Sequence, residues 1–185
     1  AFGGQSDPLA GKGIGGAKGY AVDVALGTID ALEWSAASRG SLYPLHHAWN
    51  NDFPITPVGG EDSLANMQDN RPVGIIRTYA YLGSNFTAQG WVDAIKKGHT
   101  SLSSGPVVEF QVNRKMPGER IQLAQAGEVT IEGQVWSSTP ITLVRIYHSG
   151  KVWKDVAVPP GSTDFRFSEK ARVAASGWFS LVVEA

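Results

Sequence analysis

The stretch Phe53-Pro-Ile-Thr-Pro-Val-Gly-Gly-Glu-Asp62 is the centre of the expected fold. Ile55 and Val58 predict a short buried strand, and the glycine pair ends it. Asp62 follows Gly60 by two residues. Because ligands of α/β proteins bind outside the carboxyl ends of the strands, Asp62 is a candidate site residue. Alone, the same stretch is also typical of an ordinary turn followed by a helix N-cap.

The segments before this stretch predict a β-α-β unit. Residues 29–34 predict a short strand, and residues 41–51 predict a helix with Pro44 in its first turn, where the missing amide hydrogen costs least. Strand, helix and strand in this order imply a parallel pair with a right-handed crossover. Residues 20–27 predict a short helix or an irregular apolar segment.

The segments after it continue the alternation of strands and helices. Residues 73–82 are rich in β-branched and aromatic side chains and predict a strand. Residues 87–97 predict a helix that Thr87 caps and Gly98 ends. Another short strand is expected over residues 99–104.

The pattern then becomes all-β, with the boundary near residue 105. Short alternating segments separated by turn signals predict an antiparallel, immunoglobulin-like β-sandwich. The fold class is therefore α/β plus all-β, with domains at 1–104 and 105–185. The strands are expected over residues 107–113, 120–124, 128–137, 140–148, 151–158, 163–167 and 177–184.

Composition excludes several classes of protein. The 185 residues include 16 basic and 17 acidic side chains, interspersed along the chain, so no nucleic-acid surface is expected. Cysteine is absent, which excludes disulfides and thiolate metal sites. No apolar run approaches the roughly 18 residues of a membrane span, so no membrane partner is expected.

Four stretches in this order resemble one family over nearly the whole chain. They are Tyr20-Ala-Val-Asp-Val-Ala-Leu-Gly-Thr-Ile-Asp-Ala-Leu-Glu33, Pro57-Val-Gly-Gly-Glu-Asp62, Val73-Gly-Ile-Ile-Arg-Thr-Tyr-Ala-Tyr-Leu-Gly83 and Trp91-Val-Asp-Ala-Ile-Lys-Lys-Gly-His-Thr-Ser-Leu-Ser-Ser-Gly-Pro106. Together they look like the C-terminal part of metal-dependent hydrolases related to the PHP (polymerase and histidinol phosphatase) superfamily. Phe110-Gln-Val-Asn113, Pro117-Gly118 and Val144-Arg-Ile-Tyr-His-Ser-Gly-Lys-Val152 resemble the β-sandwich that follows the barrel in that branch.

The resemblance implies a distorted (β/α) barrel that binds zinc or manganese. Its late Gly-x-Asp element is present as Gly60-Glu61-Asp62, so Asp62 is the implied metal ligand. Many members continue with Ala-His, whereas this chain has Ser63-Leu64, and the His-x-His element of the family is absent. We therefore expect a fragment that lacks most metal ligands and binds no metal tightly by itself.

The remaining polar residues give weaker signals. His46 and His47 are adjacent on the expected helix and point about 100° apart, so one packed and one solvated imidazole are expected. Asp30 and Glu33 are interpreted as ordinary polar groups at a strand end. Arg77 and Tyr79 would line the barrel mouth of the complete enzyme and bind substrate there, the alternative being a structural arginine.

Two functions follow from these observations. The first is the C-terminal part of a hydrolase that acts on a small-molecule substrate through metal-activated water. The alternative is a non-catalytic sandwich that binds carbohydrate or protein, for which an exposed Trp136 or Trp153 would be the marker. An incomplete barrel would leave open strand edges, so a homo-oligomer that covers them is expected.

Overall fold

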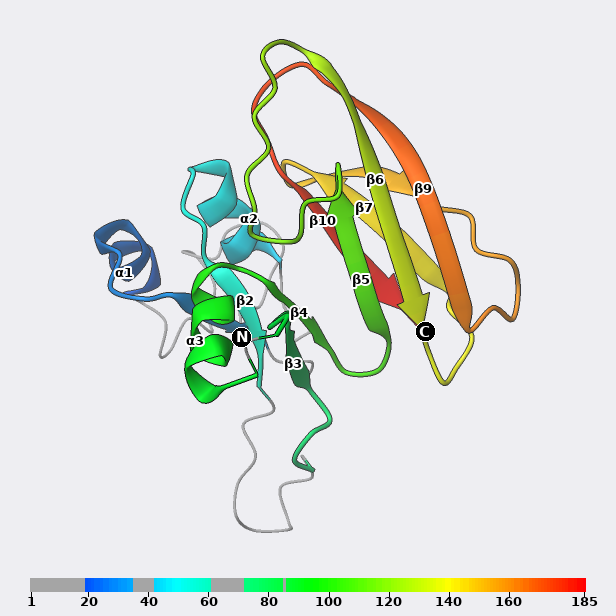
Figure 1. Cartoon of the computed structure of the whole chain (residues 1–185), viewed down its shortest axis with the longest axis horizontal. Coiled ribbons are helices and arrows are strands. Elements are labelled where there is room, and N and C mark those ends of the chain that lie inside the picture. The colour runs from blue at the N-terminus through cyan, green and yellow to red at the C-terminus, as the bar shows by residue number, and fades with distance from the viewer. Residues whose placement is uncertain (1–18, 35–41, 61–71, 85) are drawn as a thin grey trace. The chain divides into compact units, whose positions relative to one another are not determined.

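The computed structural model describes residues 19–34, 42–60, 72–84 and 86–185. The chain divides into two compact units, residues 1–104 and 105–185 (Figure 1). Within the described ranges, no helix has the length and apolar character needed to cross a membrane.

The first unit contains short helices and strands whose ends follow from local sequence. Gly27 ends the first helix in the left-handed conformation, with φ at 66°. Thr87 caps the third helix by accepting a hydrogen bond of 2.9 Å from the amide of Gly90. The elements are α1 (Tyr20–Leu26), β1 (Ala31–Trp34), α2 (Tyr43–Asn50), β2 (Thr56–Gly59), β3 (Arg77–Ala80), α3 (Ala88–Lys96) and β4 (Thr100–Ser103).

Strands β1 and β2 form the expected parallel pair. Ala31 lies opposite Thr56 and Trp34 opposite Gly59, so both strands end at the same edge. Helix α2 lies between them in the chain, which confirms the predicted strand–helix–strand order.

Strands β3 and β4 differ from the expectation. Only Arg77–Ala80 of the predicted strand 73–82 is extended, because residues 74–76 form turns and bends, with Gly74 at φ 90°. The two strands pair antiparallel, Arg77 opposite Ser103, although α3 connects them. A (β/α) barrel is built of parallel strands, so the partial barrel is not established by the described residues.

A small apolar core holds α1 and α2 to the parallel pair. Val24, Leu45, Ala48 and Ile55 are buried, and aromatic side chains pack around them. Two polar atoms of these aromatics find backbone partners: Tyr20 Oη donates to Pro44 O at 3.2 Å, and Trp49 Nε1 donates to Ile55 O at 2.8 Å. These two hydrogen bonds satisfy the polar atoms that Tyr20 and Trp49 bring to the core.

Threonine hydroxyls connect β2 to its other neighbours. Pro57 lies within β2 and has no amide hydrogen to give to a second strand. Instead Thr56 Oγ1 donates to Ile95 O in α3 at 2.7 Å, and Thr100 Oγ1 in β4 donates to Pro57 O at 3.3 Å. Thr56 and Thr100 are both buried, so these bonds form away from water.

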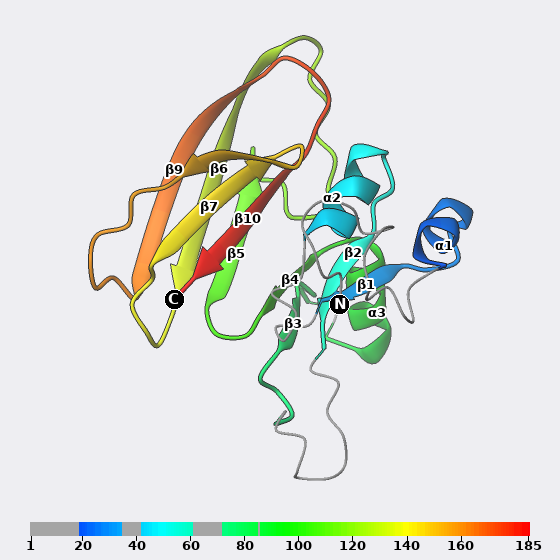
Figure 2. The ribbon, with the colours of Figure 1, turned by 180° about the vertical axis from the view of Figure 1, so that it is seen from behind.

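The second unit consists of two antiparallel sheets that pack around a common core, as in a β-sandwich. One sheet has the order β5-β6-β9 and the other β10-β7-β8. Figures 1 and 2 show the two stacked sheets, seen from opposite sides of the molecule. The strands are β5 (Val107–Val112), β6 (Gly127–Trp136), β7 (Leu143–His148), β8 (Lys151–Asp155), β9 (Asp164–Val173) and β10 (Phe179–Glu184).

The strands differ from the expected ones in several bounds: β7 begins at Leu143 instead of residue 140, and β8 ends at Asp155 instead of residue 158. Residues 120–124 form no strand, so that prediction was wrong. The expected strand 163–167 extends to Val173, because β9 pairs with β6 along its whole length.

The sandwich core comes from alternate residues of the facing strands. Ile131, Val135, Val144 and Ile146 have no exposed surface. Gly133 lies in the same row of β6, and the ring of Phe167 covers it: a Cβ atom there would be 2.5 Å from Phe167 Cζ. The ring fills the space that the glycine leaves open.

The hydroxyl of Thr56 gives a direct test of how β2 is held. Thr56→Val keeps the shape of the side chain and removes this bond. The carbonyl of Ile95 still accepts from the amide of Gly98 at 2.9 Å, so the expected cost is about 0.5–1.5 kcal/mol. Urea unfolding followed by NMR signals of residues in the first unit should show this loss. Thr163→Val, at an exposed position of the second unit, is the control and should leave that transition unchanged. An equal stability of Thr56→Val and wild type would contradict the role of the bond.

Candidate functional site

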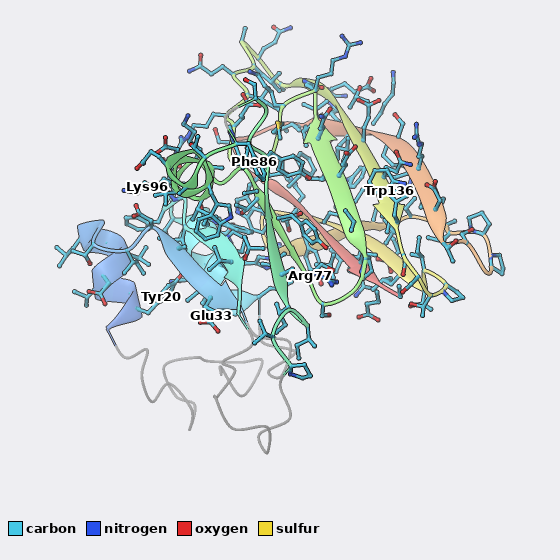
Figure 3. The ribbon with its side chains drawn as sticks, turned by 60° about the horizontal axis from the view of Figure 1, so that its bottom comes forward. Tyr20, Glu33, Arg77, Phe86, Lys96 and Trp136 are labelled. Carbon is cyan, nitrogen blue, oxygen red and sulfur yellow. The ribbon has the colours of Figure 1, made fainter. Side chains whose placement is uncertain are left out.

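The carboxyl edge of the parallel pair brings Glu33 and Gly60 together. Glu33 is the last but one residue of β1, and Gly60 follows β2 directly. A Cβ atom on Gly60 would lie 2.6 Å from Glu33 Cδ and 2.7 Å from its Oε1, so the carboxyl group of Glu33 lies against the glycine backbone. Figure 3 labels Glu33 at this end of β1. Glu33 is exposed, so its carboxylate is accessible to a ligand.

Gly59 lets a third strand approach the same edge. A Cβ atom on Gly59 would lie 2.7 Å from Ile76 Cγ2 and 3.3 Å from Arg77 O. The amide of Gly59 donates to Thr78 Oγ1 at 2.8 Å. Because only glycine leaves room for this contact, the pair Gly59-Gly60 positions both β3 and Glu33.

Arg77 and Tyr79 lie on the other face of β3 from Thr78. Side chains alternate along a strand, and the side chain of Thr78 is the one that points to β2. Arg77 is exposed and Tyr79 is half-buried. The structure therefore separates these two proposed substrate-binding side chains from the side chain of Thr78, and their role stays a prediction.

Asp62 lies outside the residues that the structure describes. The described residue nearest to it in the chain is Gly60, beside Glu33. The sequence alone indicates an ordinary polar group at Glu33, because the proximity of Glu33 to Gly60 depends on the register of β1 against β2. The position of Glu33 near the end of an expected strand is the only signal in the sequence.

The histidines do not converge on one point. His46 is half-buried with its ring centroid 5.9 Å from that of Trp49, whereas His47 is exposed and stacks on Tyr43 at 5.5 Å. One imidazole is packed and the other solvated, as expected. Among residues 19–34, 42–60, 72–84 and 86–185, no group of three or more His, Asp or Glu side chains could hold a metal. The described residues alone do not fit a metal centre.

His148 occupies an apolar position at the end of β7. Its ring stacks on Phe179 with centroids 4.5 Å apart, and burial lowers its pKa. The Nε2 atom is buried, although the residue as a whole is half-buried. A Cβ atom on Gly177 would lie 2.8 Å from this Nε2, so the nitrogen faces backbone rather than an open site.

The outer face of the β5-β6-β9 sheet forms a shallow polar hollow. Its volume is about 570 Å³, and its centre is the row Glu109, Gln134 and Arg166, one residue from each strand. Gln134 is buried, and its side-chain amide donates to Asp164 at 2.9 Å. Within the described part of the chain, no ion pair involves Glu109 or Arg166. Both charges are therefore available to a ligand.

The two tryptophans proposed as sugar-binding markers have different environments. Trp153 packs against the sandwich core, edge-to-face with Phe179 at 6.2 Å between ring centroids, and offers no platform. Trp136 lies two residues beyond Gln134 at the end of β6, on the outer face by alternation, and is half-buried (Figure 3). Only Trp136 remains a candidate for stacking.

Comparison with known protein families, with curated proteins and with solved structures gave no match.

The packed histidine predicts a pH dependence. Burial lowers the pKa of His46 from 6.5 to about 4, so between these values the unfolded chain binds a proton that the folded chain does not. The stability of the first unit should be full above pH 6.5 and decrease as the pH falls towards 4. We expect the unfolding temperature of this unit to fall by several degrees from pH 7 to pH 5.

The variant His46→Gln isolates this contribution. Other groups also titrate in this range, so the quantity to compare is the change in unfolding temperature of wild type and variant. His47→Gln, at the adjacent exposed position, is the matched control. A wild-type decrease no steeper than that of His46→Gln would contradict the prediction.

Proposed function

We propose that this chain is the C-terminal portion of a metal-dependent hydrolase related to the PHP superfamily. The observation that supports the proposal is the contact between Glu33 and Gly60 at the carboxyl ends of parallel β1 and β2. In α/β folds this edge is where ligands bind. Asp62, the implied ligand, follows Gly60 by two residues in the sequence. In this proposal, residues 1–104 are the end of a barrel and residues 105–185 an appended immunoglobulin-like sandwich.

The roles within this proposal are limited to what these residues would do. Asp62 would provide one carboxylate to a zinc or manganese ion in the complete enzyme, and Glu33 would add negative charge at the same edge. Arg77, exposed at the start of β3, would attract an anionic group of a small-molecule substrate. The metal-activated water of the complete enzyme would hydrolyse that substrate. A homo-oligomer that covers the incomplete barrel stays part of the proposal.

Manganese as a paramagnetic probe tests the location of this carboxylate edge. At millimolar concentrations, Mn²⁺ should broaden the amide signals of Glu33, Gly59 and Gly60 before those of other exposed carboxylates. Asp62→Asn and Glu33→Gln should each weaken the effect several-fold, because each removes one negative charge. Gly60→Ala should also weaken it, since the new methyl group would displace the carboxyl of Glu33.

Asp93→Asn, in α3, is the control for a general loss of charge. Equal broadening around every exposed carboxylate, or no effect of Asp62→Asn, would count against a ligand edge here. Micromolar binding by calorimetry would instead show that the chain holds a complete site, contrary to the proposal.

A second candidate is a carbohydrate-binding sandwich, which the polar hollow favours. Glu109 and Arg166 offer charged groups that can bond sugar hydroxyls, and Trp136 lies beyond them on the same face. Binding sites for sugars combine such polar groups with an aromatic ring that stacks on the apolar face of the sugar.

Affinity gel electrophoresis with soluble polysaccharides tests the second candidate. A polysaccharide that retards the wild-type chain should retard Trp136→Ala and Arg166→Gln at least about tenfold less, because each loses a direct contact. Trp91→Ala, which removes an exposed tryptophan of the first unit, should behave as wild type. If no polysaccharide retards the wild-type chain, or if Trp91→Ala has the same effect as Trp136→Ala, the hollow is not a sugar site.

A further inference from the structure

Strand β10 has one open edge. It bonds to β7 on one side, and the sheet order β10-β7-β8 leaves no described strand on the other. An open edge exposes a row of unpaired N–H and C=O groups, which other strands can join.

The hydrogen bonds of the sheet show which groups of β10 point outward. The amide of Ser149 donates to Trp178 O at 3.0 Å, so the carbonyl of Trp178 faces β7. The backbone N–H and C=O groups of Ser180 and Val182 face β7 as well, because the direction of these groups alternates from residue to residue along a strand.

The hydrogen bonds between β7 and β8 lead independently to the same assignment of inward and outward backbone groups. The amide of Val156 donates to Val144 O at 2.8 Å, so the backbone groups of Val144 face β8. The backbone groups of its neighbour Arg145 therefore face β10. Arg145 lies opposite Val182. The N–H and C=O groups of Phe179, Leu181 and Val183 therefore point away from the sheet, and no hydrogen bond within the described residues involves them.

The other three edge strands of the sandwich carry features that discourage pairing. Strand β8 has Lys151 and Lys154 and a register irregularity opposite Ile146 and Tyr147. Charged residues recur along β9, and Val112 of β5 already bonds to Lys115. Short, bulged and lysine-rich edges are common protections against edge-to-edge association.

Strand β10 lacks these protections. Its sequence, Phe179-Ser-Leu-Val-Val-Glu184, has no charge before the last residue, no proline and no lysine. Its register against β7 is regular from end to end. Phe179, Leu181 and Val183 pack into the sandwich core, which fixes the strand in place.

We propose that the open edge of β10 pairs with β10 of a second copy of this chain, antiparallel about a two-fold axis at Leu181. In that arrangement Leu181 lies opposite its own copy, and Phe179 lies opposite Val183 of the second copy. All three outward N–H and all three outward C=O groups of each copy then find partners, because the row is symmetric about Leu181. The sheet becomes continuous across both copies.

The cross-strand side chains suit the same arrangement. On the inner face, Phe179 of one copy lies beside Val183 of the other, and the two Leu181 side chains are adjacent, all apolar. On the outer face, Ser180 lies beside Val182, so no like charges meet. This inference is independent of the proposed hydrolase or sugar-binding function.

Sedimentation equilibrium of the full chain, with paired variants, tests the proposal. The wild-type chain should form a concentration-dependent dimer. Val183→Pro removes one outward N–H per copy and leaves the bonds to β7 in place, so it should weaken the dimer about tenfold or more. Val183→Ala keeps the N–H, loses part of the same side chain, and should dimerise nearly as wild type.

A second pair of variants and hydrogen exchange keep the test decisive if Val183→Pro folds poorly. Val182→Lys places an ammonium group next to the joined edges and should also weaken the dimer, whereas Val152→Lys, at the exposed opposite edge strand β8, should not. The amides of Phe179, Leu181 and Val183 should become protected from exchange as the concentration rises.

Three outcomes would overturn the proposal. One is a monomer at about 100 μM whose outward amides exchange rapidly. Another is a dimer that Val183→Pro and Val182→Lys leave unchanged. The third is protection of these amides in the monomer, which would show that a segment of the same chain covers the edge.

Discussion

The hydroxyl bonds that surround β2 fix this strand against α3 and β4. Pro57 prevents β2 from forming a regular ladder of backbone hydrogen bonds on both sides, and side-chain bonds take its place. Thr56 of β2 donates to α3, and Thr100 of β4 donates to β2. These buried bonds fix β2 between the parallel partner β1 and the antiparallel pair β3–β4. Since the carboxyl end of β2 is also where Gly60 meets Glu33, the geometry of the candidate edge depends on them.

Sequence patterns predicted those elements whose ends carry their own chemistry. Thr87 and Gly98 bracket α3, and the alternation of apolar residues in β6 and β7 predicted two central strands of the sandwich. The parallel pairing of β1 and β2 followed from the order of elements alone. In these segments the local signal and the tertiary packing agree.

Features that depend on tertiary pairing could not be read from the sequence. The β-rich composition of residues 73–82 predicted a longer strand than Arg77–Ala80, because propensity does not report where a partner strand ends. The antiparallel direction of β4 has no local signature. The approach of Glu33 to Gly60 and the row Glu109, Gln134 and Arg166 both depend on strand register, which a single sequence does not specify.

The ring of Phe167 over Gly133 has a consequence for the alignment of β9 on β6. A slip of two residues would keep every side chain on its proper face, so the apolar pattern alone does not oppose it. Such a slip would place the Phe167 ring opposite Val135 or Ile131, whose branched side chains leave no room for the ring of the kind that Gly133 provides. The pairing of Gly133 with Phe167 therefore selects one register of β9 on β6 among several that match the same hydrophobic pattern.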